Sequence, residues 1–220
     1  MQSSNSKTRI IICDDHPIFR EGLIRIIERN ESLSLIGECG DGNSALELIK
    51  SKNPEIAILD ITMPGKTGLS VARSVKNEKL ITKIIILTMH KDQEYISEAI
   101  DLGVHGFLLK ENAVTDLGTC IEIVKSGQYF VSPLLEDTLS QYTKKAVANT
   151  NYLLDLDNLS DIERNILRHI ANNKTSSDMS KELSLNLDQL QKYKDQIVEK
   201  LNLYGPYKLF EFALQYKDSF

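Results

Sequence analysis

The chain has 220 residues, of which 41% are hydrophobic and 26% charged, and its formal net charge is −5. This length accommodates two domains with separate cores, and the composition excludes a disordered or fibrous protein. The acidic balance argues mildly against a protein that coats nucleic acid, and no apolar run is long enough to cross a bilayer.

The first eight residues are mostly polar, and we expect a flexible N-terminal tail over 1–8. They lack the charged and then apolar pattern of a leader peptide, so a cytoplasmic location is expected. The three cysteines, Cys13, Cys39 and Cys120, form no CxxC pair, and two of them lie in apolar stretches. Buried free thiols are therefore favoured over a disulfide or a metal site.

Five short apolar stretches alternate with five stretches of helical periodicity in the first half of the chain. The strand-like stretches are RIIIC, LSLIGEC, EIAILD, KIIILT and HGFLLK, which begin at residues 9, 33, 55, 83 and 105. The helical stretches are 18–30, 43–50, 69–76, 94–102 and 114–127. This alternation predicts βαβ units, and strands that are apolar on both sides predict a parallel sheet between two helical layers. We therefore expect a five-stranded, doubly wound (flavodoxin-like) α/β domain over residues 9–128.

The pattern changes after Gly127. The stretch YFVSPLLEDTLSQY predicts one more helix, which begins near Ser132-Pro133 because proline fits a first helical turn. Residues 143–157 have no sustained period, so 129–157 is expected to be a linker with one helix. Four short amphipathic segments follow and predict a four-helix domain over 158–220.

The four C-terminal segments carry recognisable helix starts. Ser160 and Glu163 have the spacing of a capping box, Thr175 marks a second start, and a fourth segment follows Pro206. The third segment, about 187–201, has an apolar stripe at helical spacing. Its stripe consists of Leu190, Tyr193, Ile197 and Leu201. The second and third segments together have the outline of a helix-turn-helix element.

Polar residues stand at the ends of the predicted strands, where open parallel sheets collect functional groups. They are Asp14 and Asp15 after the first strand, Asp60 after the third, Thr88 after the fourth and Lys110 after the fifth. A single pair of aspartates is more often a helix cap or a solvated loop. Three converging carboxylates repel one another and need a divalent cation, for which oxygen ligands of this kind suit Mg²⁺. The hydroxyl and the ammonium are then placed to bind an anionic group that is added to the site.

Residues 9–126 resemble the receiver domain of two-component response regulators. The matching stretches are ICDDHPIFREGL, AILDITMPGKTGL, IIILTMH and GVHGFLLKENA. The resemblance implies that Asp60 accepts a phosphoryl group from the phosphohistidine of a histidine kinase. It implies that Mg²⁺ is the cofactor, with ligands from Asp14, Asp15, Asp60 and the backbone carbonyl of Thr62. The histidine of the DDHP motif receives no chemical role.

The same resemblance assigns a role to three further positions. Lys110 pairs with the new phosphoryl oxygens, and Thr88 moves to hydrogen-bond one of them. Phe107 occupies the aromatic switch position and follows the threonine inward. Such a change of local charge biases an element that has two stable positions.

Residues 159–203 resemble the helix-turn-helix output domain of LuxR/NarL-type regulators. The match lies mainly at core and cap positions, which are Leu159, Ser160, Glu163, Ile166, Leu167, Ile170, Ala171, Leu183, Ile197, Lys200 and Leu201. The departures fall on the face that meets DNA in the family. Gln189-Leu190-Gln191-Lys192-Tyr193 stands for the usual Thr-Val-Lys-x-His, and Ile162, Ser177 and Pro206 replace basic residues.

The predicted output domain is electrically neutral. Residues 159–220 contain nine Lys and Arg against nine Asp and Glu, and phosphate neutralisation supplies most of the non-specific affinity for DNA. The glutamines of the third helix remain suited to adenine edges. The candidate DNA contacts are Gln189, Gln191, Lys192, Tyr193, Lys194 and Lys200. The alternative is that these side chains form only the solvated face of an amphipathic helix.

Six of the chain's fourteen aromatic residues lie between Tyr204 and Phe220. Such a cluster either completes the core or forms a dimer surface, and a homodimer is expected on phosphorylation. The chain as a whole is predicted to be a transcription regulator, not an enzyme or a membrane-binding protein. The alternative is a phosphorylation-gated regulator whose output domain binds protein and binds DNA weakly or not at all.

Overall fold

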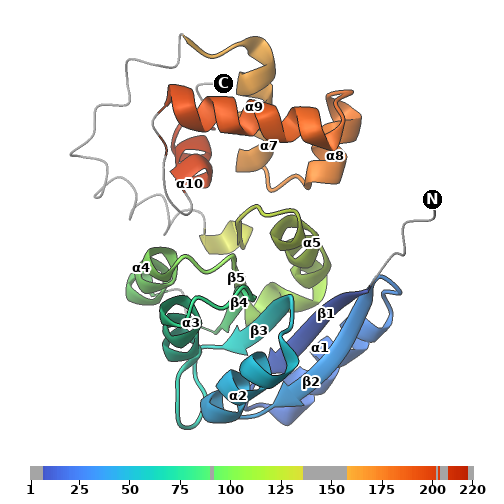
Figure 1. The fold of residues 1–220 in the computed structure, drawn as a ribbon, viewed down its shortest axis with the longest axis vertical. Coiled ribbons are helices and arrows are strands. Elements are labelled where there is room, and N and C mark those ends of the chain that lie inside the picture. The colour runs from blue at the N-terminus through green and yellow to red at the C-terminus, as the bar shows by residue number, and fades with distance from the viewer. Residues whose placement is uncertain (1–6, 90–91, 136–157, 202, 204–207, 218–220) are drawn as a thin grey trace.

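A computed structural model describes residues 7–89, 92–135, 158–201, 203 and 208–217, which form two domains (Figure 1). The first domain is built on a parallel sheet with the strand order β2-β1-β3-β4-β5-β6. Its strands are β1 (Thr8–Cys13), β2 (Leu33–Cys39), β3 (Ile56–Asp60), β4 (Lys83–Thr88), β5 (Gly106–Leu109) and β6 (Phe130–Val131). Its helices are α1 (Pro17–Glu28), α2 (Gly42–Lys52), α3 (Gly68–Asn77), α4 (Gln93–Leu102) and α5 (Ala113–Lys125).

Alternate residues of the central strands enter two separate cores. Ile11, Ala57 and Ile86 pack with the buried residues of α2, α3 and α4 on one face of the sheet. Their neighbours, such as Ile58 and Ile85, pack with those of α1 and α5 on the other face. Since both sides of each central strand are buried, the strands are continuous β-branched runs without polar alternation.

The five predicted strand–helix pairs are confirmed, with boundaries that differ by no more than two residues. The structure adds β6, a two-residue edge strand within the segment assigned to the linker. Ser132 holds it in place, because its N–H donates to the Phe107 carbonyl (2.9 Å) and its Oγ accepts from the Leu109 N–H (3.2 Å). Of the helix predicted after Ser132, residues Pro133–Leu135 form a 3-10 turn. The remainder, the 143–157 linker and most of the predicted tail lie outside the described residues.

His105, just before β5, lies at the seam between the sheet and the segment that leads to β6. Its Nδ1 accepts a hydrogen bond from the Ile84 N–H (3.3 Å), and its ring stacks on Tyr129 with 5.8 Å between centroids. Burial, followed by the nearby charge of Lys83, lowers the pKa of His105 to about 4. The imidazole is therefore neutral in the folded protein at physiological pH.

Acidification is expected to lower the free energy of unfolding of the first domain, because His105 is buried in its neutral form. In the unfolded chain His105 has a pKa near 6.5, so stability that is present above pH 6.5 is lost as the pH falls toward 4. At pH 5 the loss amounts to about 2 kcal/mol relative to a variant without the imidazole. Urea unfolding of the native protein and His105→Asn at pH 7.5 and pH 5 measures this difference. Equal pH dependence of the two proteins would contradict it.

The second domain consists of four helices, as predicted. They are α7 (Asp161–Ala171), α8 (Ser176–Glu182), α9 (Leu187–Lys200) and α10 (Lys208–Gln215). Ser184, in the left-handed region with φ of 54°, makes the turn between α8 and α9 of the helix-turn-helix. Met179, Leu190 and Ile197 bury the inner faces of these two helices. No helix among the described residues is long and apolar enough to span a membrane.

The aromatic cluster at the C-terminal end is partly a core feature. Phe210 and Phe212 are each 3% exposed and complete the interior of the four-helix domain. Tyr216 packs on Phe212 with 4.6 Å between ring centroids. The other three aromatics of the cluster lie outside the described residues, so the dimer surface stays a prediction.

The two domains meet where α5 leads into β6 (Figure 1). The hydroxyl of Ser176, the first residue of α8, donates to Gln128 Oε1 at 2.5 Å. The amide of Asn173 donates to the carbonyl of Val131 at 3.4 Å. The second domain thus contacts the segment that follows α5 of the first domain, at the edge of the sheet that β6 extends.

Candidate functional site

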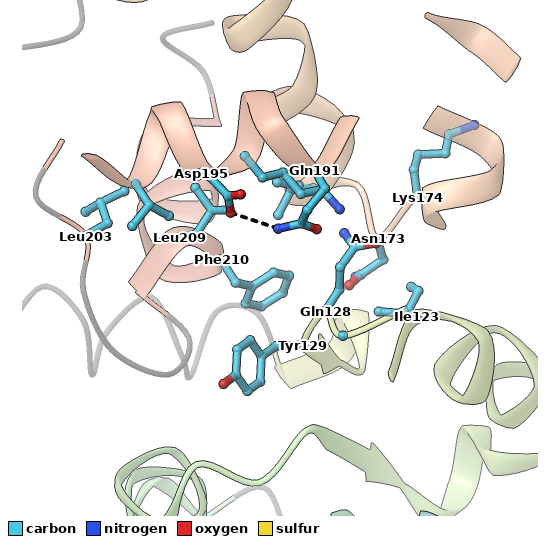
Figure 2. A pocket seen from close by; sticks show the side chains of 14 residues that line it. Ile123, Gln128, Tyr129, Asn173, Lys174, Gln191, Asp195, Leu203, Leu209 and Phe210 are labelled. Atoms are coloured by element: carbon cyan, nitrogen blue, oxygen red, sulfur yellow. Dashed lines mark hydrogen bonds between the residues drawn. The ribbon is translucent and has the colours of Figure 1, made fainter. Parts of the chain in front are cut away.

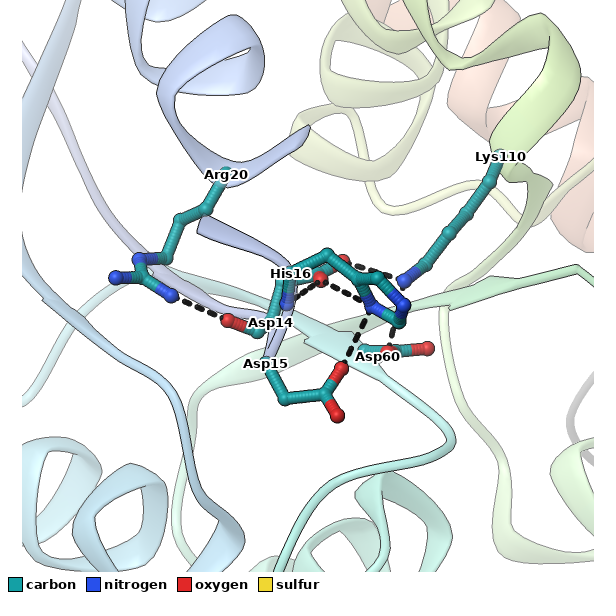
Figure 3. A network of polar contacts seen from close by, with 6 residues as sticks. All are labelled: Asp14, Asp15, His16, Arg20, Asp60 and Lys110. Atoms are coloured by element: carbon teal, nitrogen blue, oxygen red, sulfur yellow. Dashed lines mark hydrogen bonds and ion pairs between the residues drawn. The ribbon is translucent and has the colours of Figure 1, made fainter. Parts of the chain in front are cut away.

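Three carboxylates converge at the ends of β1 and β3 (Figure 3). Asp14 is fully buried, Asp60 is 3% exposed, and Asp15 lies between them and solvent. One ligand atom from each, together with one from His16, lies within 4.8 Å of all the others. The strand order places β1 beside β3, and residues that follow parallel neighbours share one edge.

Lys110 is the cation that the sequence predicted for this site. Its Nζ lies 2.8 Å from Asp14 Oδ2 and 2.8 Å from Asp60 Oδ2, and its side chain is almost fully buried. Lys110 Nζ lies over the ring of Phe19, 5.0 Å from the ring centroid. One ammonium thus faces three carboxylates, so the site keeps an excess of negative charge.

The carboxylate of Asp60, the predicted acceptor, is held in an environment that disfavours its charge. Burial raises the pKa of Asp60, and the charge of Asp14 raises it further. The hydrogen bond and the charge of Lys110, with a hydrogen bond from the Thr62 N–H, oppose the rise without cancelling it. A group that adds positive charge here would therefore be bound favourably.

The residues present fit Mg²⁺ well. Asp14 Oδ2 and Asp15 Oδ1 are buried oxygens that accept no hydrogen bond of good geometry, although Lys110 and His16 lie close to them. Hard oxygen donors with a net negative charge are the set that this cation prefers. Asp14, Asp15 and Asp60 are the side chains that would hold it.

The loop that follows Asp60 packs too tightly for side chains at two glycines. A Cβ on Gly68 would lie 2.2 Å from the carbonyl oxygen of Asp60, and one on Gly42 would lie 1.8 Å from that of Lys66. The Gly42 N–H donates to the Pro64 carbonyl at 3.0 Å, which ties this loop to the start of α2. The Met-Pro-Gly-Lys-Thr-Gly stretch therefore fixes the backbone that follows Asp60.

Two residues of the site had no predicted role. The ring Nδ1 of His16 lies 2.7 Å from Asp15 Oδ1, and the backbone N–H of His16 donates to Asp14 Oδ1 at 2.9 Å. Arg20 Nη1 donates to the Asp14 carbonyl at 2.6 Å while its Nε bonds Glu38 at 2.7 Å. At the N-terminal end of α1, His16 thus contacts both aspartates, and Arg20 holds the backbone of Asp14. In the sequence, only the spacing of His16 and Arg20 from the aspartate pair could have indicated that these two residues contact it.

The two predicted switch residues lie on the same part of the sheet. Thr88 ends β4 and pairs in register with Leu109, next to Lys110, and it is 1% exposed. Phe107 is 2% exposed and belongs to the core that includes α4. The aromatic side chain is thus already inside in this structure.

The candidate DNA contacts on α9 have different surroundings. Gln189 Oε1 accepts from the Asn186 N–H (3.0 Å) as half of a capping box. Gln191 is exposed and donates to Asp195 at 2.9 Å. Lys192 is exposed, and Tyr193 packs partly on the core.

The two remaining lysines of this set are engaged within the protein. Lys194 is only 5% exposed. Lys200 Nζ lies 2.8 Å from Glu163 Oε2, which also accepts from the Ser160 N–H and Oγ at 2.7 and 2.8 Å. The capping box of α7 is therefore confirmed, with Lys200 as a third partner. Lys192 and Lys200 are both exposed, and Lys200 is engaged with Glu163, so Lys192 is the exposed lysine of the candidate set that is not tied to α7.

Known proteins share both the sequence and the fold. Residues 10–122 match the family described as the response regulator receiver domain. The chain is 32% identical to the "Probable transcriptional regulatory protein NarL" of Mycobacterium tuberculosis over 90% of its length and 89% of that protein. It is 31% identical to the transcriptional regulatory protein DesR of Bacillus subtilis over 88% of its length and 90% of that protein.

A solved structure extends the likeness to both domains. The RcsB response regulator of Salmonella typhimurium superposes with a TM-score of 0.57 at 24% identity, over 94% of this chain and 98% of that one. At this identity the comparison shows the fold, which consists of a parallel receiver sheet followed by four helices. The chain therefore belongs to the response-regulator family of two-component systems, as a transcriptional regulator of the NarL/LuxR type.

Proposed function

We propose that the receiver accepts a phosphoryl group on Asp60 from the phosphohistidine of a partner kinase, with Mg²⁺ as cofactor. The observation that carries this is the placement of Lys110 at 2.8 Å from both Asp60 and Asp14, beside unsatisfied carboxylate oxygens. An acceptor carboxylate, a cation beside it and a set of hard oxygen ligands for Mg²⁺ are the parts that phosphoryl transfer requires.

The transfer follows from the roles of these side chains. A carboxylate oxygen of Asp60 forms a bond to phosphorus while the phosphorus–nitrogen bond of the phosphohistidine breaks, and the imidazole leaves with a proton. Lys110 then exchanges its contact with Asp60 for a phosphoryl oxygen, and the hydroxyl of Thr88 bonds a second one. Bound Mg²⁺ supplies charge neutralisation, held by Asp14, Asp15, Asp60 and, by family resemblance, the Thr62 carbonyl.

The output domain binds DNA through α9 in this proposal. Support comes from the helix-turn-helix formed by α8 and α9 and from the two relatives described as transcriptional regulatory proteins. Gln191 and Lys194 line the space between the domains, so their use as DNA contacts requires the output domain to leave the receiver. Phosphorylation shifts the population toward that separated form, in which a homodimer forms.

Loss of Lys192, an exposed lysine of α9, is expected to weaken DNA binding. In Lys192→Ala, affinity falls severalfold for all sequences, and the slope of log K against log salt falls by about one, as for one lost phosphate contact. Fluorescence anisotropy with acetyl-phosphate-treated protein at several salt concentrations measures both. The matched control is Lys125→Ala, which removes an exposed lysine from the receiver.

The second candidate function is a phosphorylation-gated protein-interaction regulator, and the equal count of nine basic and nine acidic residues in 159–220 favours it. Selection of random duplexes with phosphorylated protein distinguishes the two. Enrichment of a two-fold repeated site supports DNA binding as the function. No enrichment, together with duplex binding that does not depend on salt, supports protein interaction. A cytoplasmic location belongs to either proposal, since a histidine kinase is the donor in both.

A further inference from the structure

A cavity of about 250 Å³ lies between the receiver and the output domain (Figure 2). Ile123 and Tyr129 contribute to its receiver wall, and Val198 and Phe210 contribute to its output wall. Figure 2 shows the ring of Phe210 above that of Tyr129, each coming from a different domain. The space is therefore largely apolar and belongs to neither domain alone.

One wall of this cavity carries a buried ammonium. Lys194 is 5% exposed, and Ser176 Oγ accepts a hydrogen bond from its Nζ at 3.2 Å. The same hydroxyl donates a hydrogen bond to Gln128 Oε1, 2.5 Å away. Among the residues that the structure describes, no carboxylate forms an ion pair with Lys194. The adjacent Asp195 accepts from Gln191 instead, at 2.9 Å.

This arrangement is unusual for a charged side chain. Lysines are almost never fully buried unless they are paired, and an ammonium has three donors, of which one is used here. Burial lowers the pKa of Lys194 to about 8, so most molecules still carry the charge at pH 7. An anion in the cavity would supply the missing partner.

We propose that this cavity binds a small organic carboxylate whose charged head pairs with Lys194 and whose apolar body fills the space between the domains. A single carboxylate balances a single ammonium. Lys174, the other lysine of the lining, is ion-paired with Glu182 at 2.7 Å, and Asp195 adds a negative charge to the lining, so a phosphate dianion would lack cationic partners in a wall that is mostly apolar. A cavity of about 150 Å³ holds benzene, so this one holds a body of roughly eight to ten carbon atoms.

The site has a regulatory consequence that rests on the proposed function. Because both domains form its walls, a bound carboxylate stabilises the contact between them. If phosphorylation of Asp60 separates the domains, it must also lower the affinity for the carboxylate by the same factor. The carboxylate then acts as a second input that opposes the kinase.

Octanoate is the probe, titrated into the full chain by isothermal calorimetry at pH 7, with octan-1-ol as its uncharged counterpart. We expect saturable binding of one octanoate, weakened at least about 10-fold in Lys194→Met, which removes the charge and keeps the bulk. Lys181→Met, which replaces an exposed lysine of α8 outside the cavity, is expected to bind octanoate as the native protein does. Val198→Phe, which fills the cavity and keeps Lys194, is expected to bind neither octanoate nor octan-1-ol.

Equal binding of octanoate and octan-1-ol would overturn the proposal, as would full octanoate affinity in Lys194→Met or in Val198→Phe. Absence of saturable octanoate binding to the native chain would overturn it too. Repeating the titration after acetyl phosphate treatment, with Asp60→Asn as control, tests the coupling separately. Unchanged affinity in phosphorylated protein would refute the coupling, while the site itself is judged by the titrations on untreated protein.

Discussion

Asp60→Asn is expected to abolish phosphoryl incorporation from acetyl phosphate, with a loss on the order of 10³-fold or more. The amide keeps the shape of the side chain and its place beside Lys110, but it removes the anionic oxygen that forms the bond to phosphorus. Intact-protein mass spectrometry with Mg²⁺ present measures the acid-labile phosphoryl group directly.

The matched control for this experiment is Asp101→Asn, which removes an exposed carboxylate of α4 from the same domain. It should leave incorporation unchanged. Undiminished labelling of Asp60→Asn would place the acceptor elsewhere, with Asp14 as the next carboxylate in contact with Lys110.

Lys110→Met is expected to destabilise the receiver by about 3 kcal/mol when divalent cations are removed. Asp14 and Asp60 are both buried, and the substitution leaves them facing each other without the ammonium that lies 2.8 Å from each. Excess Mg²⁺ should recover part of the loss, because a cation bound to the folded form compensates the same carboxylates.

Urea unfolding followed by circular dichroism, with EDTA or with MgCl₂, measures the effect of Lys110→Met. Lys125→Met is the control, since that side chain is exposed at the end of α5. An equal loss of stability with and without Mg²⁺ would mean that Lys110 acts through packing, for example on Phe19, and not through charge.

The receiver fold could be predicted because its physical causes are local in the sequence. Strands buried on both faces must be continuous apolar runs, and Ile10, Ile58 and Ile85 come from such runs. The carboxylates could be predicted to meet because residues at the ends of neighbouring parallel strands share an edge. The capping box at Ser160 has a fixed spacing of its own.

Other features depend on contacts that no local pattern records. β6 has two residues, and its order comes from pairing with β5 and from Ser132. The role of Arg20 depends on where α1 crosses the site. The burial of Lys194 depends on where the output domain contacts the receiver, which periodicity within α9 does not reveal. Gln189 was predicted for DNA, yet the structure also gives it a capping contact with Asn186.

The short strand β6 also sets the tether between the domains. Because pairing with β5 and the turn at Pro133–Leu135 anchor the chain as far as residue 135, the covalent connection between the anchored receiver and residue 158 is 22 residues, 136–157. Twenty-two residues span at most about 75 Å, so an output domain that leaves the receiver stays within that distance of it. Within one chain, separation and return of the output domain are therefore unimolecular, and dilution should act only on the dimerisation that follows separation.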